Sequence, residues 1–551
     1  MYRASFLPAM IACLTLALAP VMSALAADER QSLEELRNTV INLLQALVDQ
    51  GVITREKADQ MVKAAQAKAA ADAAALAKED EGAVRVPYVP QIVKDEIAKQ
   101  VAEEVKPQVV AGVVDQAKTE GWGVPGALAD WLKRTRLSAD VTLREEGLFY
   151  DKNNTPQPNY YAINQAGGPL AAGQNAVLDS TETRIRFRGR LHFAVDSDVT
   201  DSITAGFRLA TGNTTDLVSE TQTIDGTAPY TIGIDELYIR DDERNAQRFP
   251  WLSVVVGRYL NPYDSPTDLI FHKDLTFEGL AATGRFGLGD GSAQQSHIFL
   301  TLGGHPLQEV EFSAQDKWLV GGQLGSYLRL TDAQNVRFAA AFYDYFNVTG
   351  RLNPPDSTIY DYTAPQFMRL GNTVFNIENN GNPESQLWAY ASKFRLLNLN
   401  ATYTVSVGRY NAIASVDAVR NFGFNAAQVE ANTGYYVAPR TKGYQGQVSF
   451  GYPAVLTPGS WRALVGYRYL QRDAVIDEYT DSDFHYFGGT NAQGYYLIID
   501  YGVANRVWLR LRYLSANDID PTPFAVTTGV LNNKTDTFGV DTLQFDVNTR
   551  F

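Results

Sequence analysis

Alternation of charged and apolar side chains is the feature that most constrains how this chain can fold. Between Arg184 and Phe193, four arginines and one histidine fall on one face of an extended strand, and apolar residues or glycine fall on the other. Weaker versions recur over 397–405, 444–452 and 506–513. A packed core could not accept four arginines on one face, because burying unpaired charge is costly. A wide, water-filled interior accepts them, so the pattern favours a membrane β-barrel over a soluble β-sandwich.

The second observation concerns the number of strands between Leu137 and Phe551. Every backbone polar group must be paired in lipid, so such strands have to close into an all-β transmembrane barrel. We predict sixteen antiparallel strands, with eighteen as the alternative, over residues 137–149, 182–195, 201–211, 231–240, 251–259, 276–286, 295–303, 317–330, 335–347, 389–400, 401–421, 442–452, 461–472, 492–502, 506–515 and 539–551. The border between the tenth and eleventh falls near Val405–Gly408. Short and long connections alternate, as in outer-membrane barrels, and sixteen strands leave a water-filled channel.

The first 26 residues read as a secretory signal peptide. Arg3 supplies the positive charge, Phe6 to Met22 is uncharged and apolar, and Ala24-Leu25-Ala26 provides the small-residue cleavage pattern. The only cysteine of the sequence, Cys13, lies in this segment. A disulfide framework and a cysteine-based zinc site are therefore excluded. With five histidines in the chain, a histidine-rich metal cluster is not expected either.

Residues 27–136 predict an α-helical periplasmic stem ahead of the barrel. Leu33, Leu36, Val40, Leu43 and Leu47 are spaced 3, 4, 3 and 4 residues apart, which is the seam of a coiled coil. This seam covers about two heptads, so an amphipathic helix packed on its own neighbour is the alternative. We favour self-association through the stem, and the stem could also reach the cell wall.

The C-terminal strand carries its apolar residues on one face, at Leu543, Phe545, Val547, Thr549 and Phe551. A last strand that ends in Phe551 resembles the C-terminal assembly signal of bacterial outer-membrane proteins. This resemblance implies that the barrel-assembly machinery is a partner and that the barrel lies in outer-membrane lipid.

The mature chain resembles a family of bacterial outer-membrane porins that carry an N-terminal helical, coiled-coil periplasmic segment. The similarity covers nearly all of the mature chain, although each motif is short. The motifs are Leu47-Val48 with Gly51-Val52-Ile53-Thr54, Arg85 to Gln91, Gly121 to Pro125, Gly257 to Pro262, Thr267 to Ile270 and Asp274 to Leu280. The resemblance implies a passive channel that assembles as a homotrimer. It does not imply a particular solute, because family and substrate are separate questions.

Arginines on the predicted strands are the candidate pore-lining residues, because rings of arginine favour anions in a pore. They are Arg184, Arg186, Arg188, Arg190, Arg258, Arg462, Arg468, Arg506, Arg510 and Arg512. Acidic residues fall in predicted loops or turns, at Asp241, Asp242, Glu243, Asp473, Asp477, Glu478, Asp481 and Asp483. One hypothesis is a basic band on the lumen wall beneath an acidic outer rim. The other, equally weighted, is that the arginines pair with loop carboxylates and hold a constriction loop in place.

Two connections are candidates for a loop that narrows the channel. The first is Leu260–Leu275, which occupies the place of the inward-folded loop in many porins that this chain resembles; its candidate residues are Asp264, Asp268, His272, Lys273 and Asp274. The second is Asn347–Leu387, whose length suggests a function. Its Tyr360, Tyr362, Phe367 and Phe375 could pack inward or fold back on the loop itself.

These features together favour an outer-membrane porin for passive diffusion of ions and small hydrophilic solutes, with anion preference through the arginine band. The net charge of −14 argues against nucleic-acid binding. No nucleophile elbow, P-loop or H-E-x-x-H motif occurs, so we expect no enzyme, cofactor or metal site. The alternative is a structural protein with a closed barrel, acting as a cell-wall tether or adhesin.

Overall fold

The computed structural model describes residues 130–551, apart from 213–216, 219–220, 225, 227–228, 293, 312, 486–487, 521, 527–529 and 537, together with residues 60, 63–64 and 67–68. The predicted signal peptide (1–26) and the coiled-coil seam from Leu33 to Leu47 lie outside the described residues. So does the rest of the predicted stem before residue 130, apart from those five positions. The barrel belongs to a compact unit that spans Leu128–Phe551. No helix among the described residues is long and apolar enough to cross a membrane.

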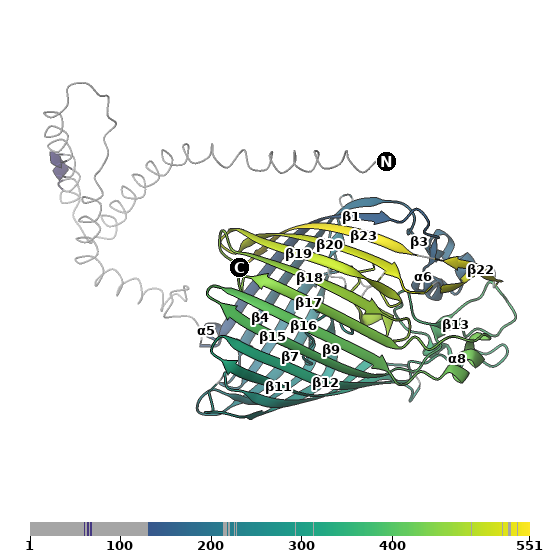
Figure 1. Cartoon of the computed structure of the whole chain (residues 1–551), viewed down its shortest axis with the longest axis horizontal. Helices are drawn as coiled ribbons and strands as arrows, with labels where there is room; N and C mark the ends of the chain where they lie inside the picture. The colour runs from purple at the N-terminus through teal and green to yellow at the C-terminus, as the bar shows by residue number, and fades with distance from the viewer. Residues whose placement is uncertain are drawn as a thin grey trace, which may run out of the picture. The chain divides into compact units, whose positions relative to one another are not determined.

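The barrel sheet has 17 strands; one of them is the two-residue β6 (Gln222–Thr223) of a loop, and the other sixteen form the closed antiparallel wall, which confirms the predicted number. Figure 1 shows the barrel from the side. Each strand pairs with its neighbours in chain order, and the barrel closes because the first strand pairs with both the second and the last. The wall strands are β1 (Thr135–Tyr150), β4 (Arg184–Asp198), β5 (Ile203–Thr211), β7 (Ile232–Arg244), β8 (Pro250–Leu260), β9 (Thr276–Gly287), β10 (His297–Gln308), β11 (Lys317–Thr331), β12 (Gln334–Phe346), β15 (Arg395–Val407), β16 (Tyr410–Asn421), β17 (Lys442–Gly451), β18 (Trp461–Leu470), β19 (Ala492–Ala504), β20 (Val507–Asp518) and β23 (Gly539–Arg550).

Short elements occupy the long connections and the approach to the barrel. Helix α5 (Asp130–Lys133) precedes β1. The others are β2 (Gln157–Pro158), α6 (Tyr160–Ala166), α7 (Pro169–Ala172), η1 (Gly173–Ala176), β3 (Val177–Leu178), β6 (Gln222–Thr223), η2 (Asp361–Thr363), β13 (Val374–Asn376), β14 (Trp388–Tyr390), α8 (Ala426–Thr433), η3 (Asp477–Tyr479), β21 (Thr522–Val526) and β22 (Val530–Asp536).

The alternating pattern places apolar side chains on the outer face and polar ones inside. On β4, Ile185 and Phe187 are 59% and 57% exposed on the outside of the barrel. Arg188, whose side chain points to the inner face, is buried. Successive side chains of a strand point to opposite faces, so this segregation follows directly from the sequence. The outer face therefore suits lipid, and the charged face lines the interior.

The boundary between the tenth and eleventh strands differs in part from the prediction. The two strands meet at a two-residue turn, Gly408-Arg409, close to the predicted border, and Gly408 adopts a φ of 61°. The tenth strand, however, begins at Arg395 and not at residue 389. Residues 388–390 instead form β14, which pairs with β13 inside the preceding loop. Buried apolar residues in that loop, such as Ala389 and Ala391, extend the apolar pattern beyond the wall and explain the error.

Two glycines, Gly257 on β8 and Gly279 on β9, sit where no other residue fits easily. Gly257 has a φ of 111° and Gly279 a φ of 118°, in the left-handed half of conformational space. A Cβ on Gly257 would lie 2.2 Å from the carbonyl oxygen of Leu237, and a Cβ on Gly279 would lie 2.2 Å from that of Gly304. These positions flank the connection between β8 and β9, so the backbone there is committed to one course.

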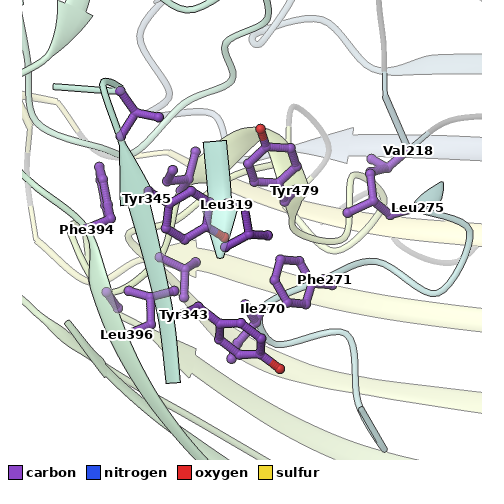
Figure 2. Close-up of a cluster of buried hydrophobic side chains, with 14 of the residues drawn as sticks. Val218, Ile270, Phe271, Leu275, Leu319, Tyr343, Tyr345, Phe394, Leu396 and Tyr479 are labelled. Carbon is purple, nitrogen blue, oxygen red and sulfur yellow. The ribbon is translucent and has the colours of Figure 1, made fainter. Parts of the chain in front are cut away.

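A hydrophobic cluster lies inside the barrel, where loops meet the wall (Figure 2). Leu319 and Tyr343 project from wall strands, while Ile270 and Phe271 come from the connection between β8 and β9. Tyr479 is contributed by the connection between β18 and β19. Part of the interior is therefore filled by packed loops, and the remaining space is what a solute could use.

Candidate functional site

The connection between β8 and β9, residues 261–275, turns into the barrel; we refer to it as the inward loop. Tyr263, Leu269 and Phe271 are all buried. The ring of Phe271 meets those of Phe277 and Tyr343 edge to face, each at 5.1 Å between centroids. Apolar packing against the wall therefore anchors the loop, because these rings leave water only when the loop is folded inward.

Polar contacts tie the first half of the inward loop to the wall strands across the interior. The backbone of Asp264 exchanges hydrogen bonds with the side chain of Gln323 on β11, and its carboxylate lies 2.9 Å from Arg337 on β12. Thr267 Oγ1 donates to Asp417 Oδ2 on β16 at 2.8 Å. Strands β11, β12 and β16 are the second, third and fifth wall strands beyond β9, so the loop leaves its own strands and extends across the lumen.

Further along, the inward loop reaches β17 and β18. The side chain of Gln447 donates to the carbonyl of Pro266 at 3.0 Å, and Arg468 donates to the carbonyl of Asp268 at 2.9 Å. At the end of the loop, Asp274 Oδ2 lies 3.3 Å from Arg190 on β4. Of the predicted constriction residues, Asp264, Asp268, His272 and Asp274 therefore contact other parts of the barrel interior; Lys273 lines a cavity described below.

A second loop, residues 471–491 between β18 and β19, also enters the barrel; we call it the plug loop. Its backbone meets the inward loop where His272 N donates to Tyr479 O at 2.8 Å. Asp473, Asp477 and Asp481 are buried. One of the two hypotheses from the sequence placed these acids on an acidic outer rim; the loop instead folds inward and carries them with it, as the other hypothesis requires.

Burial changes the acidity of two plug-loop groups. Burial raises the pKa of Asp477 to about 6, although its carboxylate accepts a 2.6 Å hydrogen bond from Tyr390. Burial also raises the pKa of Glu478 to about 8, assisted by the neighbouring charge of Asp477. In both groups burial therefore stabilises the neutral form relative to an ordinary carboxyl group.

The other acids predicted in a turn, Asp241, Asp242 and Glu243, also lie elsewhere. Strand β7 continues to Arg244, so all three are strand residues. Asp242 lies 3.0 Å from Arg240 and 3.5 Å from Arg244. The last five residues of β7, Arg240 to Arg244, are all charged, so apolar and polar residues no longer alternate there. The sequence therefore did not indicate where the strand ends.

Most of the predicted pore-lining arginines lie on the inner wall and are paired. Their partners come from the wall itself or from loops. Arg184 lies 3.6 Å from Asp179, Arg186 2.6 Å from Glu146, Arg188 3.3 Å from Glu146, Arg190 3.4 Å from Asp140, Arg462 3.0 Å from Asp500, Arg468 3.8 Å from Asp481, Arg510 2.6 Å from Asp500 and Arg512 2.8 Å from Asp483. The partners are of two kinds: Arg184, Arg188, Arg190, Arg468 and Arg512 lie beside loop carboxylates, as one of the two hypotheses expects. Arg186, Arg462 and Arg510 instead pair with carboxylates of the wall itself.

Two of the ten arginines do not lie on the inner wall. Arg258 pairs in register with Leu237, which is 58% exposed, and with Glu278, whose side chain is 56% exposed, and these exposures mark the outer face. Its guanidinium lies 2.9 Å from Glu278. Arg506 lies in the exposed turn between β19 and β20, with a φ of 61°. The valines at 254–256 break the alternation before Arg258, so the sequence did not indicate which face Arg258 occupies. The alternation of β20 continues into the preceding turn, so Arg506 was assigned to the strand.

Sequence reasoning also missed the carboxylates of the wall. Glu146 on β1 and Asp546 on β23 face inward, and Arg144 makes two hydrogen bonds to Asp546 at 2.7 and 3.0 Å. Their signal was available, since Glu146 shares the strand face of Arg144 and Asp546 shares that of Gln544. A search restricted to loop acids overlooked it.

The inward loop, the plug loop and the wall meet around a narrow cavity of about 50 Å³. Its charged lining comprises five cations, Arg144, Arg190, Lys273, Arg510 and Arg512, and three carboxylates, Asp274, Asp483 and Asp546. Burial acts to raise the pKa of Asp274, but Lys273, His272 and Arg190 outweigh it and hold the pKa below its ordinary value. The carboxylate therefore stays charged.

A wider cavity of about 720 Å³ lies between the inward loop and the end of the barrel where the strands are joined by tight turns. Asp140, His192, Arg208 and Tyr238 line it, and so does Pro262 at the start of the inward loop. The inward loop thus borders a wide space at Pro262 and a small charged space at His272–Asp274, an arrangement that suits a constriction.

The second predicted loop, Asn347–Leu387, takes a different position. Phe375 packs in a cluster with Ile377 and Ala389 of the same connection, so that part of the loop folds back on itself. Tyr360 lies under the guanidinium of Arg351 at 4.0 Å, and Phe367 stacks on Tyr161 of α6. Tyr362 contacts Tyr360. Among the described residues, none of these aromatic side chains lines the narrow cavity.

The described residues contain no group of three or more His, Cys, Asp or Glu side chains placed to hold a metal ion. Their clusters of charge are arginine–carboxylate pairs. Such pairs can order a loop, set the field of a pore and bind anions through guanidinium groups.

Comparison with known proteins gives one family match and several structural ones. A family model described as "putative porin" matches residues 37–551. No curated protein sequence matches the chain. Among solved structures, OprB of Pseudomonas putida at high pH is 10% identical and has a TM-score of 0.41, with 78% of this chain and 97% of that chain covered. OmpF of Salmonella typhi in complex with daunomycin is 12% identical (TM-score 0.37; 76% and 97% covered). An anion-selective porin from Comamonas acidovorans is 9% identical (TM-score 0.39; 76% and 99% covered).

Proposed function

The chain belongs to the putative porin family and is an outer-membrane channel protein, and from this premise we propose that its pore passes ions and small hydrophilic solutes passively, with a preference for anions. The observation that carries the proposal is the narrow cavity, whose charged lining has five cations against three carboxylates. A constriction with surplus positive charge lowers the energy of an anion and raises that of a cation.

Pairing of the arginines limits how strong this preference can be. A guanidinium next to a carboxylate contributes little net field beyond a few ångströms. Arg190 and Arg510 also lie beside Asp140 and Asp500, which are outside the lining, so only part of the surplus of cations acts on a passing ion. Selectivity should therefore be moderate, and it should weaken as salt screens the lining. This distinguishes the proposal from a pore lined by free arginines, which would select anions strongly.

The test is single-channel recording of the purified full chain in a planar bilayer, with a salt gradient across the membrane. We expect stepwise currents. The reversal potential should have the sign that results when anions carry most of the current. Arg510→Gln should move that potential toward cation selectivity, because Arg510 lines the narrow cavity. Arg506→Gln is the matched control, since this arginine lies in an exposed turn. A cation-selective wild type, or equal effects of the two variants, would overturn the anion preference.

We also propose that the channel is a homotrimer. The pair Arg258–Glu278 supports this, since it lies on the outer face, where charged side chains in lipid are costly. Contact with another copy would remove the pair from lipid. Cross-linking of the purified protein should give trimers, and current steps should arrive in threes. Monomers throughout would contradict this part of the proposal.

The remaining roles concern the ends of the chain. We propose that residues 1–26 are removed on export and that the chain from residue 27 up to β1, which begins at Thr135 and not at the predicted residue 137, forms a helical stem in the periplasm, where it could contact the cell wall. Phe551 follows β23 and is exposed, which suits recognition of the last strand by the barrel-assembly machinery. Deleting Phe551 should lower the amount of folded barrel in the outer membrane.

A structural role with a closed barrel is the second candidate function. It is favoured by the cluster of loop and wall residues that fills part of the interior. If correctly folded protein carries no current at any voltage, the channel proposal fails and the tether or adhesin becomes the better explanation.

A further inference from the structure

Three arginines of the wall converge on one carboxylate that is not part of the wall. Asp483 of the plug loop places Oδ2 2.8 Å from Arg512 on β20 and 3.1 Å from Arg144 on β1. Its Oδ1 lies 4.0 Å from Arg188 on β4. The side chains of these arginines are between 9% and 10% exposed, so their contacts with Asp483 are largely shielded from water.

The wall around this point has more positive charge than its own carboxylates can balance. Four arginines face inward here, at positions 144, 186, 188 and 512, against the two wall carboxylates Glu146 and Asp546. Glu146 forms ion pairs with Arg186 and Arg188, and Asp546 forms an ion pair with Arg144. The surplus of two positive charges is met in part by Asp483, which the plug loop brings in from outside the wall.

Asp483 therefore occupies an anion site that the wall forms without it. Burial acts to raise the pKa of Asp483, but Arg144, Arg512 and Arg188 together hold it well below its ordinary value. The Nε of Arg512 is buried and has no hydrogen-bond partner among the described residues, which leaves a donor available in the same cage. Asp483, Arg144 and Arg512 also line the narrow cavity, so an anion in the constriction can reach the site.

We propose that Arg144, Arg188 and Arg512 form a carboxylate-binding site of the pore, in which Asp483 is a resident occupant that the carboxylate of a solute displaces. The proposal rests on the channel function proposed above and names the solute class that its constriction recognises. A carboxylate presents two oxygens to the guanidinium forks and can replace Asp483 contact for contact. Chloride has one contact point and cannot.

The attachment of Asp483 to the plug loop sets the affinity of the site for a free carboxylate. A carboxylate held on a short segment competes at an effective concentration on the order of millimolar or above. A solute carboxylate must therefore bind weakly and leave quickly, which conduction requires of a site within a pore. When a solute displaces Asp483, the plug loop loses its contact with the wall at this point, and the constriction widens.

The test measures acetate binding to the detergent-solubilised full chain by saturation-transfer NMR, which does not depend on conduction. The variant is Asp483→Asn, which keeps the size of the side chain and removes its charge. The control is Asp332→Asn, at a carboxylate that is 98% exposed in the turn between β11 and β12. We expect the acetate dissociation constant to fall at least about tenfold in the Asp483 variant, because the internal competitor is gone. The control should match the wild type.

Two further measurements make the result decisive. Arg512→Gln, added to Asp483→Asn, should abolish the tighter acetate binding, since it removes the guanidinium nearest the vacated site. In bilayers, acetate should reduce the chloride current of Asp483→Asn at lower concentration than that of the wild type. Folding of each variant is checked by its heat-dependent mobility on gels.

The outcomes separate the two proposals. Equal acetate affinity in the wild type and Asp483→Asn would overturn the carboxylate site even if the pore conducts. Tighter acetate binding that survives Arg512→Gln would do the same, since the arginine cage would not be its cause. A non-conducting wild type with the expected acetate binding would overturn the channel proposal and leave the site standing.

Discussion

Removal of the Phe271 side chain should release the inward loop from the wall. Phe271 is 1% exposed and meets Phe277 and Tyr343 edge to face, at interplanar angles of 85°. Truncation of a buried phenylalanine to alanine costs about 3–5 kcal/mol, including the cavity left behind. Because the ring belongs to a loop and not to a wall strand, that cost falls on local opening of the loop rather than on the barrel as a whole.

The expected effect can be read as a labelling rate. Thr267 is 6% exposed on the same loop, and Thr267→Cys introduces a thiol of similar size that reacts only when the loop opens. If opening is fast compared with labelling, the rate follows the open population. A cost of 3–5 kcal/mol raises that population by about a hundredfold to a few thousandfold. Phe271→Ala should therefore accelerate thiol labelling at position 267 by this factor, as followed by peptide mass spectrometry.

The control is a phenylalanine on the outer face of the barrel wall. Phe286 on β9 is 70% exposed, so Phe286→Ala in the Thr267→Cys background should leave the labelling rate within about threefold. If Phe271→Ala also changes the rate by less than about threefold, aromatic packing does not hold the loop. The polar contacts across the lumen would then be its main anchors.

Three further predictions concern other parts of the barrel. Burial raises the pKa of Glu478 from 4.5 to about 8, so the folded chain retains a proton there that the unfolded chain releases. The contribution of Glu478 to stability should therefore be fullest below about pH 4.5 and be lost as the pH rises through about 8, and Glu478→Gln should flatten this part of the slope in denaturant unfolding at pH 5 and pH 8. Gly279→Ala should destabilise the barrel by about 3 kcal/mol or more, because its φ is positive and its Cβ would clash with a carbonyl, whereas Gly304→Ala, with no atom within 4 Å, should cost less than about 1 kcal/mol in the same unfolding assay. Arg258→Glu would place a second negative charge beside Glu278, so the two carboxylates would repel each other. The variant should lower the cross-linked trimer fraction about tenfold or more, and an unchanged fraction would place the subunit contact elsewhere.

The sequence by itself determined the type of wall and the number of its strands. Lipid accepts only apolar side chains and water accepts charge, so a strand that borders both must alternate, and Arg186 and Phe187 could be assigned to opposite faces from their positions alone. The approximate bounds of β4 and β23 follow from the same rule. Arg258 was assigned to the wrong face because Val254–Val256 and Gly257 precede it, and this run without alternation gives no information about which side faces lipid.

The pairing of charges inside the barrel was decided only by the tertiary structure. Arg144 meets Asp546 across 402 positions of sequence and Asp483 across 339, and both contacts depend on barrel closure or on a loop that folds inward. Nothing local distinguishes an acid on an exposed loop from one carried into the lumen, since Asp483 lies in a polar, loop-like stretch in either case. Local alternation fixes which face of a strand each residue occupies, because that depends on the solvent on each side. Which charges meet depends on the closed barrel and its inward-folded loops, and only the complete fold supplies that information.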